Sequence, residues 1–335
     1  MTAGFSSPVQ KLFGGQPYLI RDVAPSDAPD VLQLFEEVFG HRTDSRWYAW
    51  KYLAGVGNAL GLWDALGCLK AHCAGTPRTV SWCGKHVAGL QVGDVMVSTD
   101  IRGLLMRKGP FQQVSSRFYA SRVGANQRYQ LAWGFPNQRH MRLGVKLDLF
   151  WDAGMISQLR WAVGQEWLWP WYSVTALSGG EAGFDDQVDA AWASMAADLQ
   201  NHVLGVRDAA YIRWRFLARP DRQYKLFCLR RRFTGKVLAV IVMRIADGTA
   251  ELLDIIGPRD AMRSAIRAAI KQCAQAGVSS LSAWASPALV EVVQNTGAEV
   301  TQSGASLAII KESNFSEADV MAARWWWMGG DTDFL

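Results

Sequence analysis

A basic loop that contains two glycines separates a predicted strand from a predicted helix. The loop, IRGLLMRKG, carries Arg102, Gly103, Arg107, Lys108 and Gly109. Glycine lets main-chain N–H groups approach an anion closely, and the helix that starts at residue 110 adds free donors and the positive end of its dipole. The loop therefore predicts a site for phosphate groups, with an ordinary strand-to-helix turn as the alternative.

The surroundings of this loop are strongly basic. Residues 101–147 hold nine Lys and Arg and no Asp or Glu. Residues 1–155 carry a net charge of +6 (17 basic minus 11 acidic), against −1 (18 minus 19) for residues 156–335. Such a segment predicts a nucleic acid, an anionic lipid surface or a phosphate-rich cofactor as partner, with a solvated basic face as the alternative.

The composition excludes several classes of protein. Of 335 residues, 19% are charged and 50% are hydrophobic, which excludes extensive disorder. The longest uncharged stretch, residues 167–180, is too short to span a bilayer, and the first residues lack the pattern of a secretory signal. We therefore expect a cytoplasmic protein with no membrane span.

The cysteines and histidines predict no metal site. Cys68, His72, Cys73, Cys83 and His86 crowd together, but their spacing does not fit a zinc site. An odd number of cysteines, five in all, suits reduced thiols in a cytoplasm.

The chain also repeats itself. The block DSRWYAWKYLA at residues 44–54 matches DAAYIRWRFLA at residues 208–218, GKHVA at 84–88 matches GKVLA at 235–239, and DVMVSTD at 94–100 matches DIIGPRD at 254–260. Three matched blocks in one order indicate a duplicated domain, and their wide separation indicates two globular halves rather than a solenoid.

Each half is expected to contain the same order of elements: two helices, a meander of strands, a helix, a strand and further elements. Hydrophobic spacing and turn residues predict first-half helices near residues 26–40, 46–53 and 110–123, and strands at 68–74, 87–97 and 129–135, with a turn at Thr76 and Pro77. In the second half they predict helices at 188–201, 209–217, 261–276 and 287–296, the last capped by Ser286, and strands at 224–230, 237–245, 250–256 and 279–285. The fold class is α/β, with a mostly antiparallel sheet and a parallel strand pair around the long helix.

Specific blocks resemble the GNAT superfamily of N-acyltransferases in a tandem, bacterial form. The resemblance rests on DVMVSTDIRGLLMRKGPF, WGFPNQRHMRLGV, YIRWRFLARP and WWWMGGDTDFL, and it covers about residues 18–150 and 186–311. It implies two tandem GNAT-like domains, each a mixed, mostly antiparallel sheet flanked by helices. The predicted units are a cofactor-binding domain at 18–153, a connector at 154–184, a degenerate GNAT-like domain at 185–312 and a C-terminal tail at 313–335. The glycines of the loop are displaced relative to the usual pattern of the family.

The resemblance implies coenzyme A, as acetyl-CoA, for the basic loop. Arg102, Arg107 and Lys108 would meet its pyrophosphate and 3′-phosphate, beside Gly103 and Gly109. The resemblance also implies that Asn137 contacts the pantetheine arm; the alternative is an ordinary Pro-Asn turn.

Three services are needed for acyl transfer to an amine: a neutral amine, stabilisation of an oxyanion and a proton for the leaving thiolate. Asp94 is the candidate base, and a carboxylate fixed by a neighbouring arginine is its alternative. The resemblance implies that main-chain N–H groups of Met96 or Val97 hold the oxyanion. It also implies that His140 protonates the thiolate; the alternative is a surface or phosphate-contacting histidine. The many cations nearby should lower the pKa of His140.

The second copy lacks the glycine loop, since Gly257, Pro258, Arg259 and Asp260 lead directly into a helix. The resemblance thus implies an N-acyltransferase of a primary amine, with an amino sugar of a polysaccharide precursor as one candidate acceptor. Two rival functions remain open. One is an RNA or aminoacyl-tRNA-binding protein that uses the aromatic residues of the basic segment, Phe118, Tyr119, Tyr129 and Trp133. The other is a non-catalytic acyl-CoA-binding protein.

Overall fold

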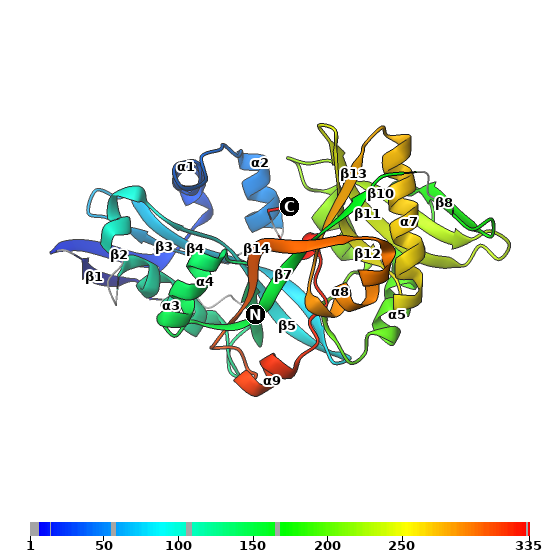
Figure 1. Ribbon diagram of the computed structural model, residues 1–335. Coiled ribbons are helices and arrows are strands. Elements are labelled where there is room, and N and C mark those ends of the chain that lie inside the picture. Colours follow the sequence, from blue (N-terminus) through cyan, green and yellow to red (C-terminus); the bar gives the residue numbers. More distant parts are fainter. Residues whose placement is uncertain (1–6, 14, 55–57, 105–108, 165–167, 333) are drawn as a thin grey trace.

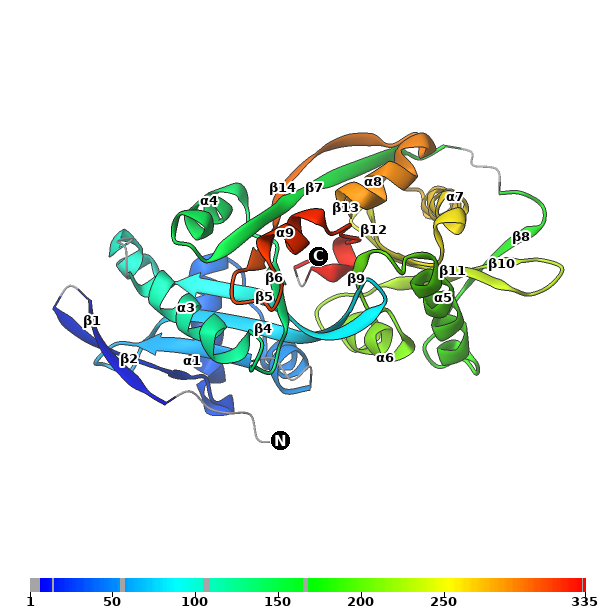
Figure 2. The same ribbon diagram turned by 90° about the horizontal axis from the view of Figure 1, so that it is seen from below.

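One continuous mixed sheet runs through the molecule, with helices packed on its faces (Figure 1, Figure 2). The computed structural model describes residues 7–13, 15–54, 58–104, 109–164, 168–332 and 334–335. Within this part of the chain the sheet has 14 strands, of which β9 (Val203–Gly205) pairs only with β4. The order of the others is β1-β2-β3-β4-β5-β6-β14-β7-β13-β12-β11-β10-β8.

The first half supplies one side of this sheet. Its strands are β1 (Val9–Phe13), β2 (Gln16–Asp22), β3 (Asn58–Trp63), β4 (Leu69–Trp82), β5 (Lys85–Val97), β6 (Leu131–Gly134) and β7 (Phe150–Ala162). Its helices are α1 (Ala28–Phe39), α2 (Ser45–Tyr48), α3 (Pro110–Arg122) and α4 (Gln138–Lys146), with the short segments η1 (Pro25–Asp27), η2 (Ala49–Ala54) and η3 (Thr99–Leu104).

The second half supplies the other side. Its strands are β8 (Tyr172–Ala176), β9, β10 (Lys225–Arg231), β11 (Val237–Ala246), β12 (Thr249–Ile256), β13 (Ser280–Ala285) and β14 (Glu299–Ile310). Its helices are α5 (Phe184–Asp198), α6 (Ala209–Ile212), α7 (Arg259–Gln275), α8 (Pro287–Val293) and α9 (Glu317–Ala322), with the short segments η4 (Arg213–Leu217), η5 (Gln294–Thr296) and η6 (Gly329–Asp331).

The predicted alternation of elements is found on both sides of the sheet. Strands β3, β4 and β5 form an antiparallel meander, and β6 pairs parallel with β5 after α3. In the same way β10, β11 and β12 form a meander, and β13 pairs parallel with β12 after α7. The α/β class with a mixed sheet and flanking helices is therefore confirmed.

The last strand of each half crosses to the other half. Strand β7, which follows α4, pairs with β13, whereas β14, which follows α8, pairs with β6. The two crossing strands also pair with each other. The halves are thus joined by main-chain hydrogen bonds at the centre of the sheet (Figure 2).

The two long repeat blocks adopt the same local structure. Asp44 accepts the main-chain N–H groups of Arg46 and Trp47 and so caps α2, and Asp208 accepts that of Tyr211 and caps α6. Each capped helix continues into a π-helical segment, η2 or η4. An acidic side chain at this position satisfies donors that the first helical turn leaves free.

The hydrophobic pattern explains why helices cover both faces of the first half. In α1 the apolar stripe of Val31, Leu34 and Phe35 is buried against one face, and the helix ends at Gly40, whose φ of 74° suits glycine. In α3, Val114 and Phe118 are buried in a separate cluster on strands β2 to β4.

Some local predictions were wrong. The predicted turn at Thr76 and Pro77 lies inside β4, which runs unbroken to Trp82. Ser286 precedes α8 but gives it no side-chain cap, because its hydroxyl donates to the Trp325 carbonyl and accepts the Trp327 N–H. The connector at residues 154–184 stays a prediction, and most of β7 and all of β8 lie within it.

Candidate active site

A cavity of about 1230 Å³ opens where β5 and β6 part. The two strands pair only from Gly89 to Gln91, opposite residues 131–133. Strand β6 then ends, while β5 continues to Val97, and its residues beyond the paired part line the cavity. Main-chain groups of a strand edge are therefore available to a ligand there.

Two helices of the first half begin at this cavity. Gly109 precedes α3, and Asn137 caps α4 by accepting the main-chain N–H of His140 at 3.0 Å. The first residues of both helices line the cavity wall. Helix starts present unpaired N–H groups and a positive dipole end, which favour an anion.

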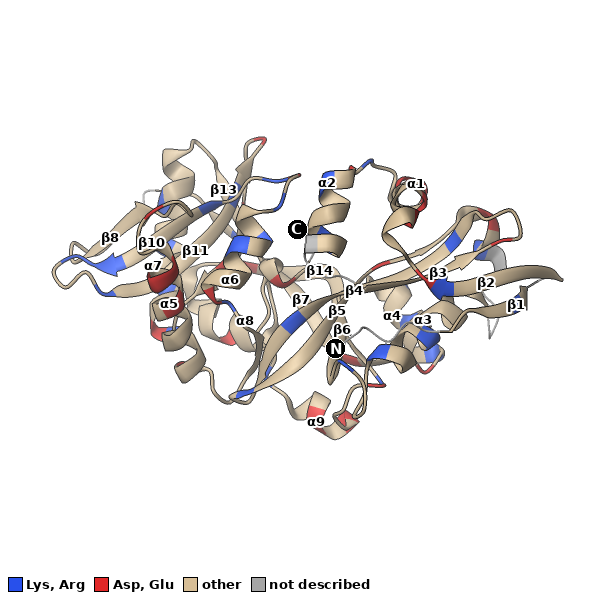
Figure 3. Ribbon diagram, turned by 180° about the vertical axis from the view of Figure 1, so that it is seen from behind, with Lys and Arg blue, Asp and Glu red and all other residues tan. Residues whose placement is uncertain are grey.

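Basic side chains lie beside the start of α4, where the charges of Arg139 and Arg102 act on His140. Lys and Arg gather on α3 and α4 (Figure 3), and Arg102 and Arg139 line the cavity. The Nε of Arg102 donates to the Val97 carbonyl at 2.9 Å. This side of the cavity thus suits phosphate groups.

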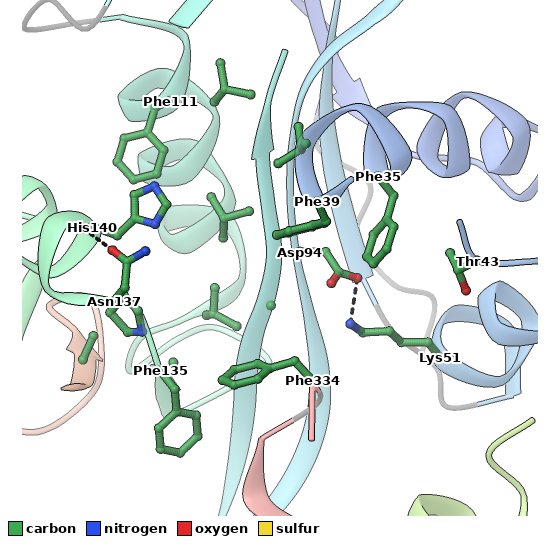
Figure 4. Close-up of a pocket in the computed structure, with 18 of the residues that line it drawn as sticks. Phe35, Phe39, Thr43, Lys51, Asp94, Phe111, Phe135, Asn137, His140 and Phe334 are labelled. Atoms are coloured by element: carbon green, nitrogen blue, oxygen red, sulfur yellow. Dashed lines mark hydrogen bonds and ion pairs between the residues drawn. The ribbon is translucent and has the colours of Figure 1, made fainter. Parts of the chain in front are cut away.

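Asp94 lies at a bulge in β5, in the floor of the cavity (Figure 4). Its φ of 49° is in the left-handed region, which Asp adopts more readily than most residues. The Nδ1 of His72, on the neighbouring strand β4, donates to the main-chain oxygen of Asp94 at 2.8 Å and so stabilises the bulge. Burial is the largest influence on His72 and lowers its pKa, so the ring is neutral at pH 7.

The Asp94 carboxylate is held by two neighbours from the first repeat block. Lys51 Nζ lies 2.7 Å from Asp94 Oδ2, and the Tyr52 hydroxyl donates to the same oxygen. Both ion-pair partners are buried, with side-chain exposures of 4% for Lys51 and 8% for Asp94. The fixed carboxylate that the sequence offered as an alternative is therefore present, although its cation is a lysine and not an arginine.

His140 lies in the first turn of α4, beside Phe111, on the opposite side of the cavity from Lys51 (Figure 4). Desolvation, followed by the charges of Arg139 and Arg102, lowers its pKa. This is the direction that the basic segment predicts. The imidazole is consequently neutral at pH 7, when it can accept a proton.

Most of the other predicted site residues also reach this cavity. Val97, Arg102, Gly109 and Asn137 line it together with Asp94 and His140. Met96 does not, since its side chain is buried in the core against α1 and α2. Gly103 lies in η3, and Arg107 and Lys108 are outside the described residues.

Sequence reasoning missed Lys51, Tyr52 and His72. The first two lie in a repeat block, where the second half has Arg215 and Phe216, so the difference between the copies was a usable signal. The second half was predicted to supply structure or acceptor surface, but its lining residues, 219–222 and Phe334, were not singled out.

The corresponding place in the second half is filled by the chain itself. Strands β12 and β13 pair as far as Leu252 and Ala283, and beyond them Met328 bridges to Ala285, followed by the buried segment η6. A Cβ added to Gly330 would lie 3.0 Å from the Leu253 carbonyl, so the segment packs tightly against β12.

Buried charges fix this filling segment. Arg207 binds both carboxylate oxygens of Asp254, at 3.0 and 2.8 Å, and also Asp331 at 2.5 Å. Arg78 of the first half lies 3.3 Å from Asp331. Asp254, the counterpart of Asp94 in the repeat, therefore belongs to a closed ionic network.

In the described part of the chain, no helix combines the length and the apolar character that crossing a membrane requires.

Comparisons with known proteins agree with this geometry. Residues 19–142 match the family model of the acetyltransferase (GNAT) domain. No curated protein matches the sequence.

Solved N-acyltransferase structures share the fold over most of the chain. A probable N-acyltransferase of Enterococcus faecalis V583 has a TM-score of 0.65 at 15% identity, covering 88% of this chain and 72% of that one. A GCN5-related N-acetyltransferase from Anabaena variabilis ATCC 29413 has a TM-score of 0.62 at 13% identity, covering 92% of this chain and 75% of that one. Saccharomyces cerevisiae N-myristoyltransferase with bound myristoyl-CoA and inhibitors has a TM-score of 0.56 at 9% identity, covering 91% of this chain and 82% of that one. Together with the domain match, these findings support an acyl-CoA-dependent acyltransferase.

Proposed function

We propose that the chain transfers an acetyl or other acyl group from coenzyme A to a primary amine in this cavity. The parting of β5 and β6 beside the starts of α3 and α4 is the observation that carries the proposal. It combines a strand edge for the amides of a pantetheine arm with an anion-binding end for phosphates. The residues fit acetyl-CoA, which would supply an activated thioester.

The cofactor contacts follow from the positions of the lining residues. Asn137 lies where β6 has ended, within reach of a chain laid along β5. Arg102 flanks the helix starts, and Arg107 and Lys108 follow it in the same loop. These three cations are our candidates for the pyrophosphate and the 3′-phosphate.

Three groups of the chain are proposed to deprotonate the amine, stabilise the oxyanion and transfer a proton to sulfur. We assign to Asp94 the removal of the ammonium proton through a water molecule. The ion pair with Lys51 holds its carboxylate in place in the cavity. The N–H groups of Met96 or Val97 stabilise the oxyanion that forms as the amine attacks. Neutral His140 accepts the proton that nitrogen loses when the C–N bond forms, and passes it to sulfur when the C–S bond breaks.

The second half is proposed to be a degenerate GNAT-like domain, in tandem with the first. The repeated order of elements and the two capped π-helical blocks support this duplication. The filled space between β12 and β13 supports the loss of a second cofactor site.

The RNA-binding alternative is not favoured. Phe118, Tyr119, Tyr129 and Trp133 are 0–3% exposed, so they are core residues and unavailable to stack on bases. Trp325, Trp326 and Trp327 of the tail are buried as well.

The unpaired cysteines fit the reducing cytoplasm that the composition predicts.

Calorimetric titration with acetyl-CoA and a thiol-release assay with primary amines test the proposal. We expect saturable binding and amine-dependent release of coenzyme A, with hexosamines among the acceptors. Binding to tRNA that falls steeply with salt, without binding to acetyl-CoA, would overturn it. Acetyl-CoA binding without transfer to any amine would favour the non-catalytic alternative.

A further inference from the structure

An arginine pair from the second half enters the cavity opposite the proposed phosphate end. The sequence Arg-Pro-Asp-Arg at residues 219–222, between η4 and β10, lines the cavity wall. The two arginines share one carboxylate, that of Asp221. Asp221 is the one acidic side chain within ion-pair distance of either arginine in the part of the chain that the structure describes.

Each of the three side-chain nitrogens of Arg219 has a hydrogen-bond partner within the fold. Its Nε and Nη2 bind Asp221 at 2.7 and 3.1 Å, and its Nη1 donates to the main-chain oxygen of Leu335 at 3.0 Å. Its side chain is only 2% exposed. The bidentate geometry commits the Asp221 carboxylate to Arg219.

Arg222 makes only a long-range contact with that carboxylate. Its Nε lies 3.7 Å from Asp221 Oδ2, which is beyond hydrogen-bond distance. Its Nη1 is buried and has no hydrogen-bond partner among the residues that the structure describes. A buried donor without a partner is unfavourable, and the side chain as a whole remains 25% exposed at the cavity wall, where an anion can approach it.

The charges around Arg222 also favour an anionic ligand. Desolvation and the cations Arg219 and Arg244 lower the pKa of Arg222, which nevertheless stays charged at neutral pH. Arg244 has a partner of its own in Glu251. Only Asp221 therefore offsets the charge of Arg222 among the described groups that line the cavity near it.

The arginine pair lies on the side of the cavity where an acceptor would enter. The Arg219 guanidinium carbon is 5.2 Å from the centre of the Trp50 ring, and Lys51, the next residue, pairs with Asp94. His140 and Asn137 lie on the other side of Asp94 (Figure 4). An amine at Asp94 would thus have the proposed cofactor on one side and, on the other, the wall formed by Lys51 and the segment that holds Arg219 and Arg222.

We propose that the acceptor carries an anionic group, a phosphate or a carboxylate, near its amine, and that Arg222 binds this group. The proposal rests on the acyltransferase function above. Arg222 is a specificity-determining residue in this scheme, because a charge-assisted contact favours charged acceptors over neutral ones of the same size.

The first test is binding of inorganic phosphate to the protein saturated with coenzyme A. Saturation occupies the proposed cofactor end and leaves the Arg222 end free. We expect phosphate to bind this complex, and Arg222→Gln to weaken it about tenfold or more. Arg263→Gln, at an exposed position on α7, is the matched control and should change nothing.

Each result of this titration decides between the two proposals. Failure of coenzyme A itself to bind would refute the acyltransferase function. Binding of coenzyme A without any binding of phosphate, or with equal phosphate affinity in wild type and Arg222→Gln, would refute the anionic acceptor alone.

The second test compares turnover of matched acceptors. Glucosamine 6-phosphate against glucosamine examines a phosphate, and an amino acid against its amide examines a carboxylate. We expect at least a tenfold higher kcat/KM for the charged member of one pair, lost in Arg222→Gln mainly through KM. Equal or better use of the neutral members would overturn the proposal.

Discussion

Trp50 and Trp214 stack on each other across the junction of the two halves, with ring centres 5.3 Å apart and planes at 15°. Trp50 Nε1 donates to the Trp214 carbonyl at 2.8 Å, and Trp214 Nε1 donates to the Trp50 carbonyl at 3.4 Å. The two residues hold the same position in the two repeat blocks. The contact is therefore reciprocal, since each indole donates to the main-chain oxygen of the other residue.

This contact should stabilise the whole chain. Replacement of either tryptophan by Leu should lower the free energy of unfolding by about 2–4 kcal/mol, because stacking area and a hydrogen bond are lost together. The double variant should lose less than the sum of the two. Urea denaturation measures this, with Trp171→Leu at an exposed position as the control. Strict additivity would show that the pair is not coupled.

Asp94→Asn should separate chemistry from binding. Asn tolerates the left-handed backbone at this position, so the bulge should survive. We expect turnover to fall about 100-fold with an unchanged dissociation constant for acetyl-CoA. The free energy of unfolding should fall by about 3 kcal/mol, because Lys51 stays buried beside a neutral amide.

Two companion variants make this prediction specific. Adding Lys51→Met to Asp94→Asn should restore much of the stability but none of the turnover. Asp152→Asn changes an exposed aspartate of β7 and should affect neither. Full turnover in Asp94→Asn would remove Asp94 from the mechanism.

His140→Gln should lower turnover about 100-fold while affinity for acetyl-CoA is kept. Since the pKa of His140 is lowered, wild-type activity should decline only as the pH falls below about 6.5. The variant should lack that decline, which a pH–rate profile from pH 5 to 9 would reveal. His86→Gln, at an exposed position on β5, should behave as wild type. Wild-type rates in His140→Gln across this range would exclude both proton roles.

Each chain should bind a single acetyl-CoA. The first half has an open cavity between β5 and β6, whereas the tail segment fills the equivalent place between β12 and β13. Calorimetry should give a stoichiometry near one. A stoichiometry of two would mean that the segment at Met328 is displaced by ligand.

His202 should make the fold sensitive to acid. The residue is 4% exposed, and its ring lies edge-on to Trp326 with no hydrogen-bond partner for either nitrogen among the described residues. Desolvation and the charges of Arg324 and Arg259 lower its pKa in the folded state. The unfolded chain therefore binds the proton more readily, and stability is lost as the pH falls below about 6.5.

Comparison of His202→Leu with wild type isolates this effect. The free energy of unfolding of the variant should fall less between pH 7.5 and 5.5, by up to about 1.4 kcal/mol for each unit that the wild-type pKa is lowered. Identical pH dependence in urea denaturation of the two proteins would contradict the assignment.

Much of the fold could be predicted from local patterns. The apolar spacing in α1, Pro110 at the start of α3 and the glycines after helices mark elements that the structure contains. The repeated order of elements was visible because the two repeat blocks keep an Asp cap and a tryptophan in register. The predicted turn at Thr76 and Pro77 was wrong because Pro77 lies between the end of the β3 pairing at Gly75 and the start of the β9 pairing at Val80, where β4 has a strand partner on one side only and tolerates proline.

The site was harder to predict, because it depends on contacts between distant segments. Asp94 was found through its motif, but its partners Lys51 and His72 lie 43 and 22 positions away and carry no motif of their own. Arg222 comes from the other half of the chain. The tail that fills the second half offered only a tryptophan run, which fits a core as well as a ligand site.

The crossing of β7 and β14 has a consequence for synthesis of the protein. When the first half leaves the ribosome, the edge of β6 that β14 will cover has no partner, because β14 lies at Glu299–Ile310. Truncation before β14 should therefore expose an unpaired edge at the wall of the cavity and favour aggregation. A nascent chain of this protein would need its last strands before the first half could become a finished acyltransferase.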